Sequence, residues 1–293
     1  MDTGTNTIRK PSWLRRSLSS QGKCGSTQKA IDDIGLHTVC LEAQCPNRLE
    51  CFGRGTATVL LLGPSCTRDC AFCAVDKSRV MPPDPKEPQR VTEICSRLGL
   101  DYIVLTMVTR DDLADGGAAH VAETVEGLHR RRPWTGVEVL VSDFAGNPDA
   151  LATVLAAEPE VLNHNLETVA RLNPTVRPQA RYGRSLELLR RAKAMSKGVV
   201  TKSGLMLGLG ESHSEVLEAL EDLREVGCRA LTLGQYLAPS SAHHPVVSYV
   251  HPDEFAEYQQ QAYDLGFLAV ASAPLVRSSY NAQALYDQVR KGR

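Results

Sequence analysis

The sequence predicts an α/β fold in which a parallel β-sheet is covered by helices. After Gly55, short β-branched or aliphatic runs alternate with longer amphipathic segments, and six such strand–helix repeats follow one another. The strand-like runs are almost continuously apolar, which is typical of parallel strands that are buried on both faces. A doubly wound sheet and an open, partial TIM-like barrel both fit these repeats, and periodicity alone does not choose between them.

The repeats define the expected elements in chain order. The predicted strands are residues 56–62, 102–107, 137–142, 161–165, 202–207 and 230–236. The predicted helices between them are residues 87–98, 118–131, 148–157, 185–195 and 214–226, and Gly227 is expected to cap the last of these. A helix over 253–266, a strand over 267–271 and a helix from Asn281 complete the chain, whereas residues 1–55 show little periodicity.

Composition excludes several classes of protein. The chain has 293 residues, which is enough for one large α/β domain or two average ones. Its 33 basic and 34 acidic side chains give a net charge of −1, and only 5% of its residues are aromatic, which argues against a general nucleic-acid surface. The longest apolar runs are far too short to cross a bilayer. We expect no nucleic-acid partner and no membrane span. We also expect a monomer, since nothing in the sequence requires a second copy.

The nine cysteines are the most informative part of the composition, because six of them fall between residues 40 and 73. A secreted disulfide framework would be small and would contain an even number of cysteines. Here the count is odd, the chain is large, and the first residues lack the apolar stretch of a secretory signal peptide. These features favour a reducing cytoplasm, where clustered thiols indicate a metal site.

The first cysteine triad is Cys66, Cys70 and Cys73, spaced C-x3-C-x2-C directly after the first predicted strand of the repeats. Three thiolates from one loop are one too few for a closed zinc site, but they suit a [4Fe–4S] cube whose fourth iron is open to a small molecule. Phe72 would shield such a cluster from water. The alternative is a zinc knuckle completed by a distant histidine.

With this triad the chain resembles the radical S-adenosylmethionine (SAM) superfamily. The resemblance implies that the open iron binds the amino and carboxylate groups of SAM, and that an electron from the cluster releases a 5′-deoxyadenosyl radical. It also implies an open, partial (β/α)6 TIM-like barrel with N- and C-terminal extensions.

A second triad lies upstream, with Cys40, Cys45 and Cys51 spaced C-x4-C-x5-C. It indicates a second cluster that needs a fourth ligand from elsewhere in the chain. With both triads in view, the chain from about residue 10 to 282 resembles the lipoyl synthase family. The other matching stretches are KPSWLR at 10–15, TRDDLADGG at 109–117, NHNLETV at 163–169, VRPQARYGRSLELL at 176–189, TKSGLMLGLGE at 201–211, TLGQYLAPS at 232–240 and RSSY at 277–280.

The resemblance implies that a serine of residues 277–280 is the fourth ligand of the auxiliary cluster, and we favour Ser279 over Ser278. An alkoxide is a harder ligand than a thiolate and matches an iron–sulfur cube poorly, which gives one iron a physical reason to leave. The family's auxiliary [4Fe–4S] cluster is held to donate its sulfur. The alternative for both serines is helix capping before Asn281.

Polar residues follow the ends of the predicted strands, where both candidate architectures place chemistry. Gly116 and Gly117 would let the backbone approach SAM, although Ala118 stands where the superfamily has a glutamate, so only backbone contacts carry over. The further candidates for SAM binding are Asn165, Glu167, Arg177, Ser185 and Glu211. The alternatives are a simple turn for the glycines, ordinary strand-end polarity for the others, and an acid at a helix N-terminus for Glu211. The adjacent His243 and His244 are interpreted as surface or partner-facing residues.

The resemblance implies a sulfurtransferase that inserts sulfur at C6 and C8 of an octanoyl-lysine to form the lipoyl group. Unactivated C–H bonds offer a general base no acidity, so a radical is required. The octanoyl group is carried by a lipoyl domain, of the E2 subunit of a 2-oxoacid dehydrogenase or of the glycine cleavage H protein, and flavodoxin or ferredoxin supplies electrons. Two rivals stay open: a radical SAM enzyme of different outcome, and a non-catalytic protein stabilised by zinc.

Three parts are expected along the chain. Residues 1–55 form an N-terminal extension with the auxiliary-cluster cysteines, residues 56–266 form the radical SAM barrel, and residues 267–293 form a C-terminal extension with the serine ligand. The lipoyl carrier domains of this family are typically acidic. We therefore expect the basic stretch around Arg15 and Arg16 to help dock the carrier.

Overall fold

The computed structural model describes residues 9–15 and 24–292, and its centre is one eight-stranded sheet with the strand order β1-β2-β3-β4-β5-β6-β7-β8. The strands are β1 (His37–Thr38), β2 (Thr58–Leu61), β3 (Tyr102–Met107), β4 (Gly136–Leu140), β5 (Val161–Asn163), β6 (Val200–Leu207), β7 (Ala230–Gln235) and β8 (Ala269–Ser272). Neighbouring strands from β2 to β8 are parallel, and β1 pairs antiparallel with β2.

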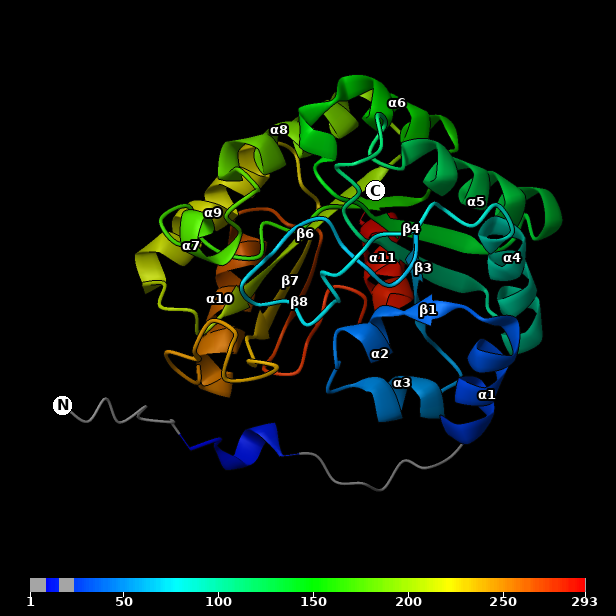
Figure 1. The fold of residues 1–293 in the computed structure, drawn as a ribbon. Coiled ribbons are helices and arrows are strands. Elements are labelled where there is room, and N and C mark those ends of the chain that lie inside the picture. The colour runs from blue at the N-terminus through cyan, green and yellow to red at the C-terminus, as the bar shows by residue number, and fades with distance from the viewer. Residues whose placement is uncertain (1–8, 16–23, 293) are drawn as a thin grey trace.

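The strand order decides between the two predicted architectures. In a doubly wound sheet the order reverses at a switch point, whereas here each strand pairs with the next one along the chain. The helices form an arc outside the strands, as Figure 1 shows. These features confirm the open, partial TIM-like barrel, in which β1 and β8 are the two edges.

The helices that cover the barrel lie close to their predicted positions. They are α4 (Glu87–Leu98), α5 (Ala118–Arg131), α6 (Pro148–Ala156), α8 (Tyr182–Met195), α9 (His213–Glu225), α10 (Pro252–Asp264) and α11 (Ala282–Lys291). The helix α9 begins with a capping box between Ser212 and Glu215 and is followed by Gly227 at a φ of 84°. Gly227 therefore ends α9 as predicted, because glycine adopts the left-handed conformation without strain.

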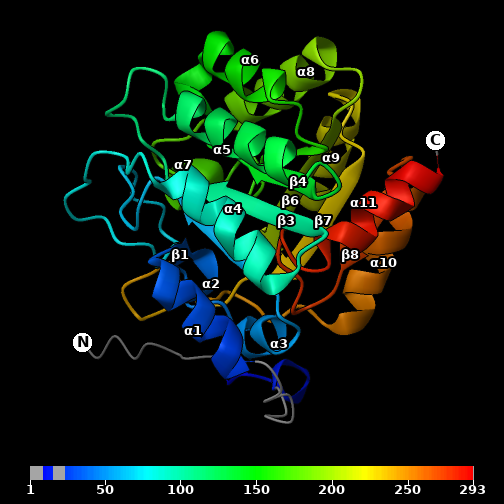
Figure 2. The same cartoon turned by 90° about the vertical axis from the view of Figure 1, so that its right-hand side faces the viewer.

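The N-terminal segment is more structured than its lack of periodicity indicated. It contains α1 (Cys24–Ile34), β1, α2 (Val39–Glu42) and α3 (Arg48–Gly53), and α1 packs against α3 and α4, as Figure 2 shows. The helices α2 and α3 are only four and six residues long, so no helical period can appear in them. Their conformation is held by tertiary contacts such as the hydrogen bond from Thr27 Oγ1 to Phe52 O, at 2.8 Å.

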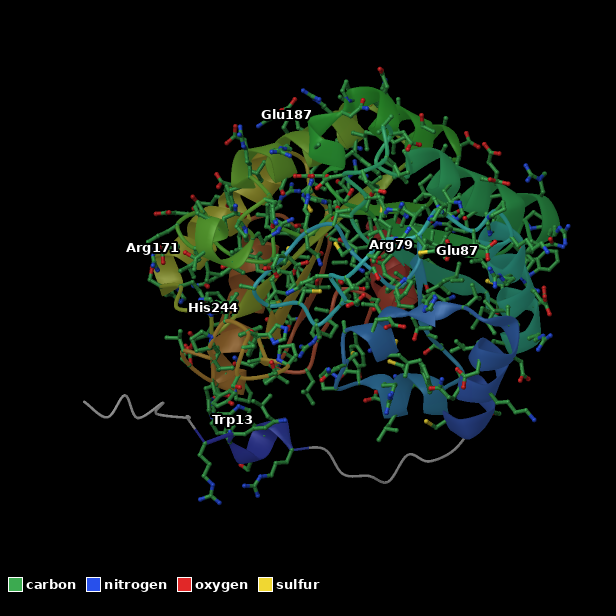
Figure 3. The ribbon with its side chains drawn as sticks, viewed as in Figure 1. Trp13, Arg79, Glu87, Arg171, Glu187 and His244 are labelled. Atoms are coloured by element: carbon green, nitrogen blue, oxygen red, sulfur yellow. The ribbon has the colours of Figure 1, made fainter. Side chains whose placement is uncertain are left out.

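Three short elements complete the described chain: the 3-10 helices Ser12–Leu14 and Phe144–Gly146, and α7 (Asn173–Val176). The Trp13 ring packs edge-on against His251, with ring centroids 5.0 Å apart, and anchors the first of them beside α10 (Figure 3). No described helix is both long and apolar enough to cross a membrane.

A buried polar layer crosses the barrel interior. The Glu138 carboxylate on β4 accepts hydrogen bonds from Lys202 Nζ at 2.8 Å, Asn163 Nδ2 at 3.1 Å and Tyr102 OH at 3.1 Å. Glu138 and Lys202 are almost completely buried, and such a pair is tolerated because the remaining hydrogen-bonding capacity of the carboxylate is used. Tyr102 carries this layer to the edge of the cavity described next.

Candidate functional site

A cavity of about 820 Å³ lies inside the barrel and extends over the loops that follow its strands. It brings together segments from both ends of the chain. Its walls include eleven residues that the sequence singled out: Cys40, Cys45, Cys51, Cys66, Cys70, Cys73, Asn165, Glu167, Arg177, Ser278 and Ser279. Phe72, which was expected to shield the first triad, also lines it.

The loop of the first triad follows β2 and is fixed by backbone hydrogen bonds to neighbouring loops. Cys66 N donates to Asp76 O at 2.8 Å. The Cys66 Sγ atom accepts from two backbone N–H groups, those of Arg68 at 3.4 Å and Thr109 at 3.3 Å. Such N–H donors suit a thiolate ligand and tune the sulfur of an iron–sulfur site.

The other two thiols of this triad sit in surroundings that disfavour a free negative charge. Burial raises the pKa of Cys70 to about 12 and that of Cys73 to about 11, although the Arg177 cation opposes the shift at Cys70. The charges of neighbouring cysteines and of Glu167 contribute to both shifts in pKa. A bound metal deprotonates its thiol ligands. These three cysteines therefore suit the ligand set of an iron–sulfur cluster, because without a metal their surroundings disfavour the thiolate form.

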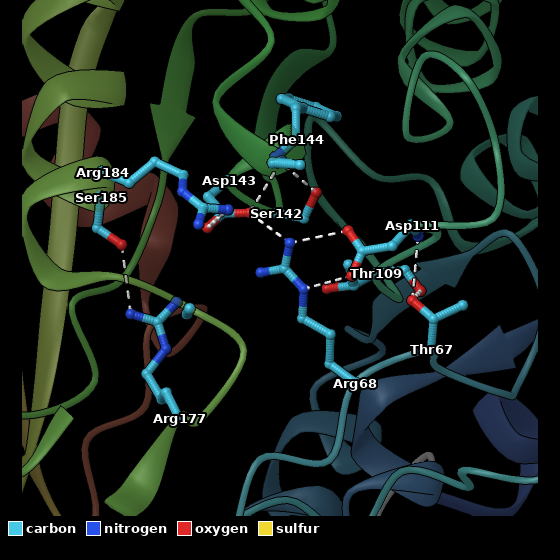
Figure 4. A network of polar contacts seen from close by, with 12 residues as sticks. Thr67, Arg68, Thr109, Asp111, Ser142, Asp143, Phe144, Arg177, Arg184 and Ser185 are labelled. Atoms are coloured by element: carbon cyan, nitrogen blue, oxygen red, sulfur yellow. Dashed lines mark hydrogen bonds and ion pairs between the residues drawn. The ribbon is translucent and has the colours of Figure 1, made fainter. Parts of the chain in front are cut away.

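Arg68, inside the first triad, fastens this loop to two other strand ends (Figure 4). Its guanidinium donates to both oxygens of Asp111, at 2.7 and 2.8 Å, and to Asp143 Oδ1 at 2.6 Å. Asp111 follows β3 and Asp143 follows β4, and Arg184 lies 3.3 Å from Asp143 Oδ2. Burial opposes ionisation of Asp143, but the hydrogen bond and charge of Arg68 hold its pKa below the usual value. We had not singled out Arg68, whose position between two cluster cysteines was the available signal.

The second triad is folded into one unit by α2, α3 and the turn between them. Gln44 adopts a left-handed conformation with a φ of 51°, and Cys45 N donates to Cys40 O at 3.2 Å, so the chain reverses between these two cysteines. Cys40 is 5% exposed. Burial and the charges of Cys45 and Cys51 raise its pKa to about 12, which reflects the proximity of the three thiols.

Within residues 9–15 and 24–292, no three His, Cys, Asp or Glu side chains are placed to hold a single metal ion. A structural zinc of the kind considered as an alternative requires four such ligands around one ion.

The serines at 278 and 279 occupy the tip of a turn that Tyr280 N closes by donating to Arg277 O at 2.9 Å. This turn faces the cavity. The capping alternative for the serines is wrong, because the N-cap position of α11 is Asn281. Gly234 on β7 lets the segment pass, since a Cβ there would overlap the Val276 carbonyl.

Asn165, Glu167 and Arg177 form a polar corner of the cavity. Asn165 Nδ2 donates to Glu167 Oε1 at 3.0 Å, whereas the buried Asn165 Oδ1 has no hydrogen-bond partner among the described residues. Burial raises the pKa of Glu167, and the cations Arg177 and Arg277 oppose that shift. A buried acceptor without a partner, beside a carboxylate and a guanidinium, suits a polar ligand with amino and carboxylate groups.

The other four candidates for SAM binding do not line the cavity, and contacts within the protein account for their positions. They are Gly116, Gly117, Ser185 and Glu211. Ser185 Oγ lies 2.8 Å from His164 Nε2 and accepts from Arg177 Nη1 at 3.4 Å. Glu211 accepts from the backbone N–H of Gly208 and Leu209, at 2.5 and 2.9 Å, and so braces its own turn.

Gly116 and Gly117 both have positive φ, at 62° and 89°, directly before α5. A Cβ on Gly117 would overlap the Leu62 side chain, and one on Gly116 would lie 3.1 Å from Phe144 Cδ1. The turn alternative therefore accounts for both glycines without a ligand.

Three histidines contribute contacts that we did not predict. His164 is buried, and its Nδ1 donates to Val141 O at 2.8 Å, while burial lowers its pKa to about 4. His243 and His244, interpreted as surface or partner-facing residues, are half-buried, and both also contact the first cysteine loop: His243 Nε2 lies 3.2 Å from Cys73 O, and the backbone N–H of His244 donates to Ala71 O at 2.8 Å.

Residues 60–223 match the family model of the Radical SAM superfamily. The chain is 51% identical over 275 residues to a lipoyl synthase of Caldicellulosiruptor saccharolyticus, covering 94% of this chain and 96% of that protein. It is 54% identical over 276 residues to a lipoyl synthase of Methylococcus capsulatus, covering 94% of this chain and 86% of that protein.

Two solved structures share the fold at low sequence identity. Methylornithine synthase is 14% identical, with a TM-score of 0.53 over 78% of this chain and 68% of its own. A maturase of the [FeFe]-hydrogenase is 12% identical, with a TM-score of 0.56 over 96% of this chain and 70% of its own. At these identities the likeness concerns the open barrel alone.

Proposed function

The chain belongs to the lipoyl synthase family of radical SAM enzymes, and we propose that it inserts sulfur at C6 and C8 of a protein-bound octanoyl-lysine. The observation that carries this proposal is the single cavity onto which both cysteine triads and the serine turn open. The cluster held by one triad would serve radical formation and the cluster held by the other would supply sulfur, so the two triads must face one substrate.

Cys66, Cys70 and Cys73 are the proposed ligands of the [4Fe–4S] cluster that the superfamily uses with SAM. When bound, this pair supplies the radical that removes hydrogen from an unactivated carbon. The chain's own residues orient SAM and exclude water. Asn165 Oδ1 would accept a hydrogen bond from SAM, and Glu167 and Arg177 would face its charged groups.

Cys40, Cys45, Cys51 and Ser279 are the proposed ligands of a second [4Fe–4S] cluster, the sulfur source. Support comes from the burial of Cys40, the turn that gathers the three thiols, and the serines on the same cavity wall. A serine oxygen is a poor match for iron among sulfur ligands, which favours loss of one iron when sulfur is withdrawn.

The proposal divides the chain into three working parts. Residues 1–55 hold the second triad, residues 56–266 form the radical-generating barrel, and residues 267–293 bring the serine. Because β1 and β8 join the same sheet, the two extensions continue the barrel's edges.

Membership of the family implies a lipoyl-carrier protein as substrate and a donor of electrons. We propose a 2-oxoacid dehydrogenase E2 subunit or the glycine cleavage H protein as carrier, flavodoxin or ferredoxin as donor, a monomeric enzyme and a reducing cytoplasm, where the nine free thiols would persist. Arg15 is exposed beside the anchored Trp13 and would help dock an acidic carrier, whereas Arg16 lies outside the described residues.

Anaerobic reconstitution followed by turnover tests the proposal. We expect about eight irons per chain, and in the presence of SAM, a reductant and an octanoyl-lysyl peptide we expect a product that has gained two sulfur atoms. Replacing Cys40, Cys45 and Cys51 with alanine should stop sulfur transfer while SAM cleavage persists. Cys24→Ala is the matched control, because Cys24 lies outside the cavity. Sulfur insertion by the triple variant would show that the donor assignment is wrong.

A further inference from the structure

Three side chains on and directly beside the short helix α3 contact the C-terminal segment, and Cys51 of the same helix lines the cavity. Asn47, directly before α3, donates from Nδ2 to Leu275 O at 2.7 Å. Glu50 Oε1 accepts from Tyr280 OH at 2.8 Å. Arg54 Nη1 donates to Asn281 Oδ1 at 3.4 Å. Since these positions are three or four residues apart, they share one helical face with Cys51.

The other end of the C-terminal segment is fixed to the barrel. Gln235 N on β7 donates to Pro274 O at 3.1 Å, and Ala273 N donates to Leu233 O at 3.2 Å. The chain from residue 273 to 276 therefore continues from β8 along β7. Beyond Val276 the turn is closed by the hydrogen bond from Tyr280 N to Arg277 O, and side chains on and beside α3 reach this segment from the opposite edge of the barrel.

Among the contacts from α3, the one between Tyr280 and Glu50 is the strongest candidate for holding the turn. A hydroxyl that donates to a carboxylate forms a charge-assisted hydrogen bond, which is stronger than a neutral one. The Arg54–Glu50 ion pair, at 2.8 Å, involves an arginine side chain that is 58% exposed, so water screens it. Tyr280 directly follows the two serines, and Glu50 directly precedes Cys51.

We propose that Glu50 and Tyr280 are positioning residues that form a clasp, which holds the Ser278–Ser279 turn against the second cysteine triad. Because Glu50 and Cys51 are neighbours on α3, the clasp fixes the distance between the triad and the turn. The clasp itself follows from the contacts of the chain, and its importance for sulfur insertion rests on the proposed function.

Two variants and a matched control test the clasp. Tyr280→Phe removes the hydroxyl, and Glu50→Gln removes the charge while keeping the shape of the side chain. Tyr182→Phe is the control, because Tyr182 OH donates to the Asp222 carboxylate at 2.8 Å in the same way but lies outside the cavity wall. All three are prepared as full-length chains, reconstituted anaerobically, beside the wild type.

Hydrogen exchange of residues 277–281 is the first readout. We expect it to quicken by about tenfold in Tyr280→Phe and less in Glu50→Gln, and to stay unchanged in Tyr182→Phe. A tenfold change corresponds to about 1.4 kcal/mol. Unchanged exchange in both clasp variants, or an equal change in the control, would overturn the proposal.

Two further readouts connect the clasp with the serine ligand. Iron release to a chelator should quicken in both clasp variants, and more SAM should be cleaved for each sulfur inserted, since a merely structural bond would move neither quantity. Unchanged iron release and an unchanged ratio would overturn the positioning role. If the wild type held a single cluster, the proposed function would fail, whereas the exchange data would still decide whether the clasp exists.

Discussion

Replacing Arg68 with methionine is the sharpest test of how the first cysteine loop is held. Arg68 is 6% exposed and joins two carboxylates that follow different strands. Arg68→Met retains much of the aliphatic length of the side chain and removes every donor. The Asp143 side chain, which is fully buried, then loses its closest cation. Breaking a buried pair by removing one partner costs about 3–5 kcal/mol.

The expected loss lies near the lower end of that range. Arg184 remains 3.3 Å from Asp143 Oδ2 and compensates in part. The Asp111 side chain is 38% exposed, so its pair with Arg68 adds at most about 1 kcal/mol. We expect a loss of about 3 kcal/mol, which corresponds to a melting temperature lower by about 5 °C for a chain of this size.

Thermal unfolding of the cluster-free chain measures this effect without interference from the metal site. Arg171→Met is the control, since Arg171 makes similar contacts with Glu215, at 2.6 and 2.9 Å, but is 57% exposed and lies on the outer rim (Figure 3). We expect its loss to stay below about 1 kcal/mol. Equal shifts in the two variants would refute the argument from burial.

The pH dependence gives a second check on the same pair. The pKa of Asp143 is depressed, so its ionised form contributes stability above the ordinary value of 3.8, and this contribution is lost as pH falls through the folded value. The difference between the wild type and Arg68→Met should therefore shrink below about pH 4. A difference that is as large at pH 3 as at pH 7 would place the effect elsewhere.

Four further predictions concern other parts of the proposed function. Gly234→Ala should displace the Val276 carbonyl and lower the amount of sulfur inserted per SAM cleaved, measured by product mass, because a Cβ has no room there. Burial lowers the pKa of His164 to about 4, so stability should fall by up to about 3 kcal/mol between pH 6.5 and 4; His164→Gln should flatten this dependence in urea unfolding. Asn165→Ala should raise the SAM dissociation constant by about tenfold, because its buried Oδ1 is the free acceptor; an unchanged constant in calorimetry would remove Asn165 from the SAM site. Carrier modification should slow with added salt if Arg15 takes part in docking, and a flat profile would contradict that role.

The barrel could be predicted from the sequence because its signals are local. Apolar runs define β3, and apolar residues at helical spacing define α4 and α5, whose bounds match the predicted ones residue for residue. The N-terminal elements α2 and α3 could not be predicted in this way, since four to six residues span fewer than two helical turns and cannot show a repeating pattern of apolar residues. Their folding depends on packing against elements that lie elsewhere in the chain.

The same distinction between local and long-range signals applies to the site. Each cysteine triad lies within one short segment, so its spacing could be recognised in the sequence. The partners of Arg68 lie 43 and 75 residues away and have no fixed spacing from it. Ser185 and Glu211 lie near strand ends as expected, but Ser185 contacts His164 and Arg177, and Glu211 contacts the backbone of its own turn. A sequence places a residue at a strand end without saying which way its side chain points.

An open barrel must close its gap by something other than strand pairing. Here β1 and β8 are the unpaired edges, and the segment after each edge leads to the other: α3 follows β1, and the serine turn follows β8. The hydrogen bonds from Asn47 to Leu275 O and from Tyr280 to Glu50 join these segments by side chains. Side-chain contacts can break and reform without disturbing a sheet, whereas a direct pairing of β1 with β8 would lock the wall. If the serine turn supplies the proposed fourth ligand and releases it during turnover, side-chain contacts therefore suit this wall better than a strand pairing.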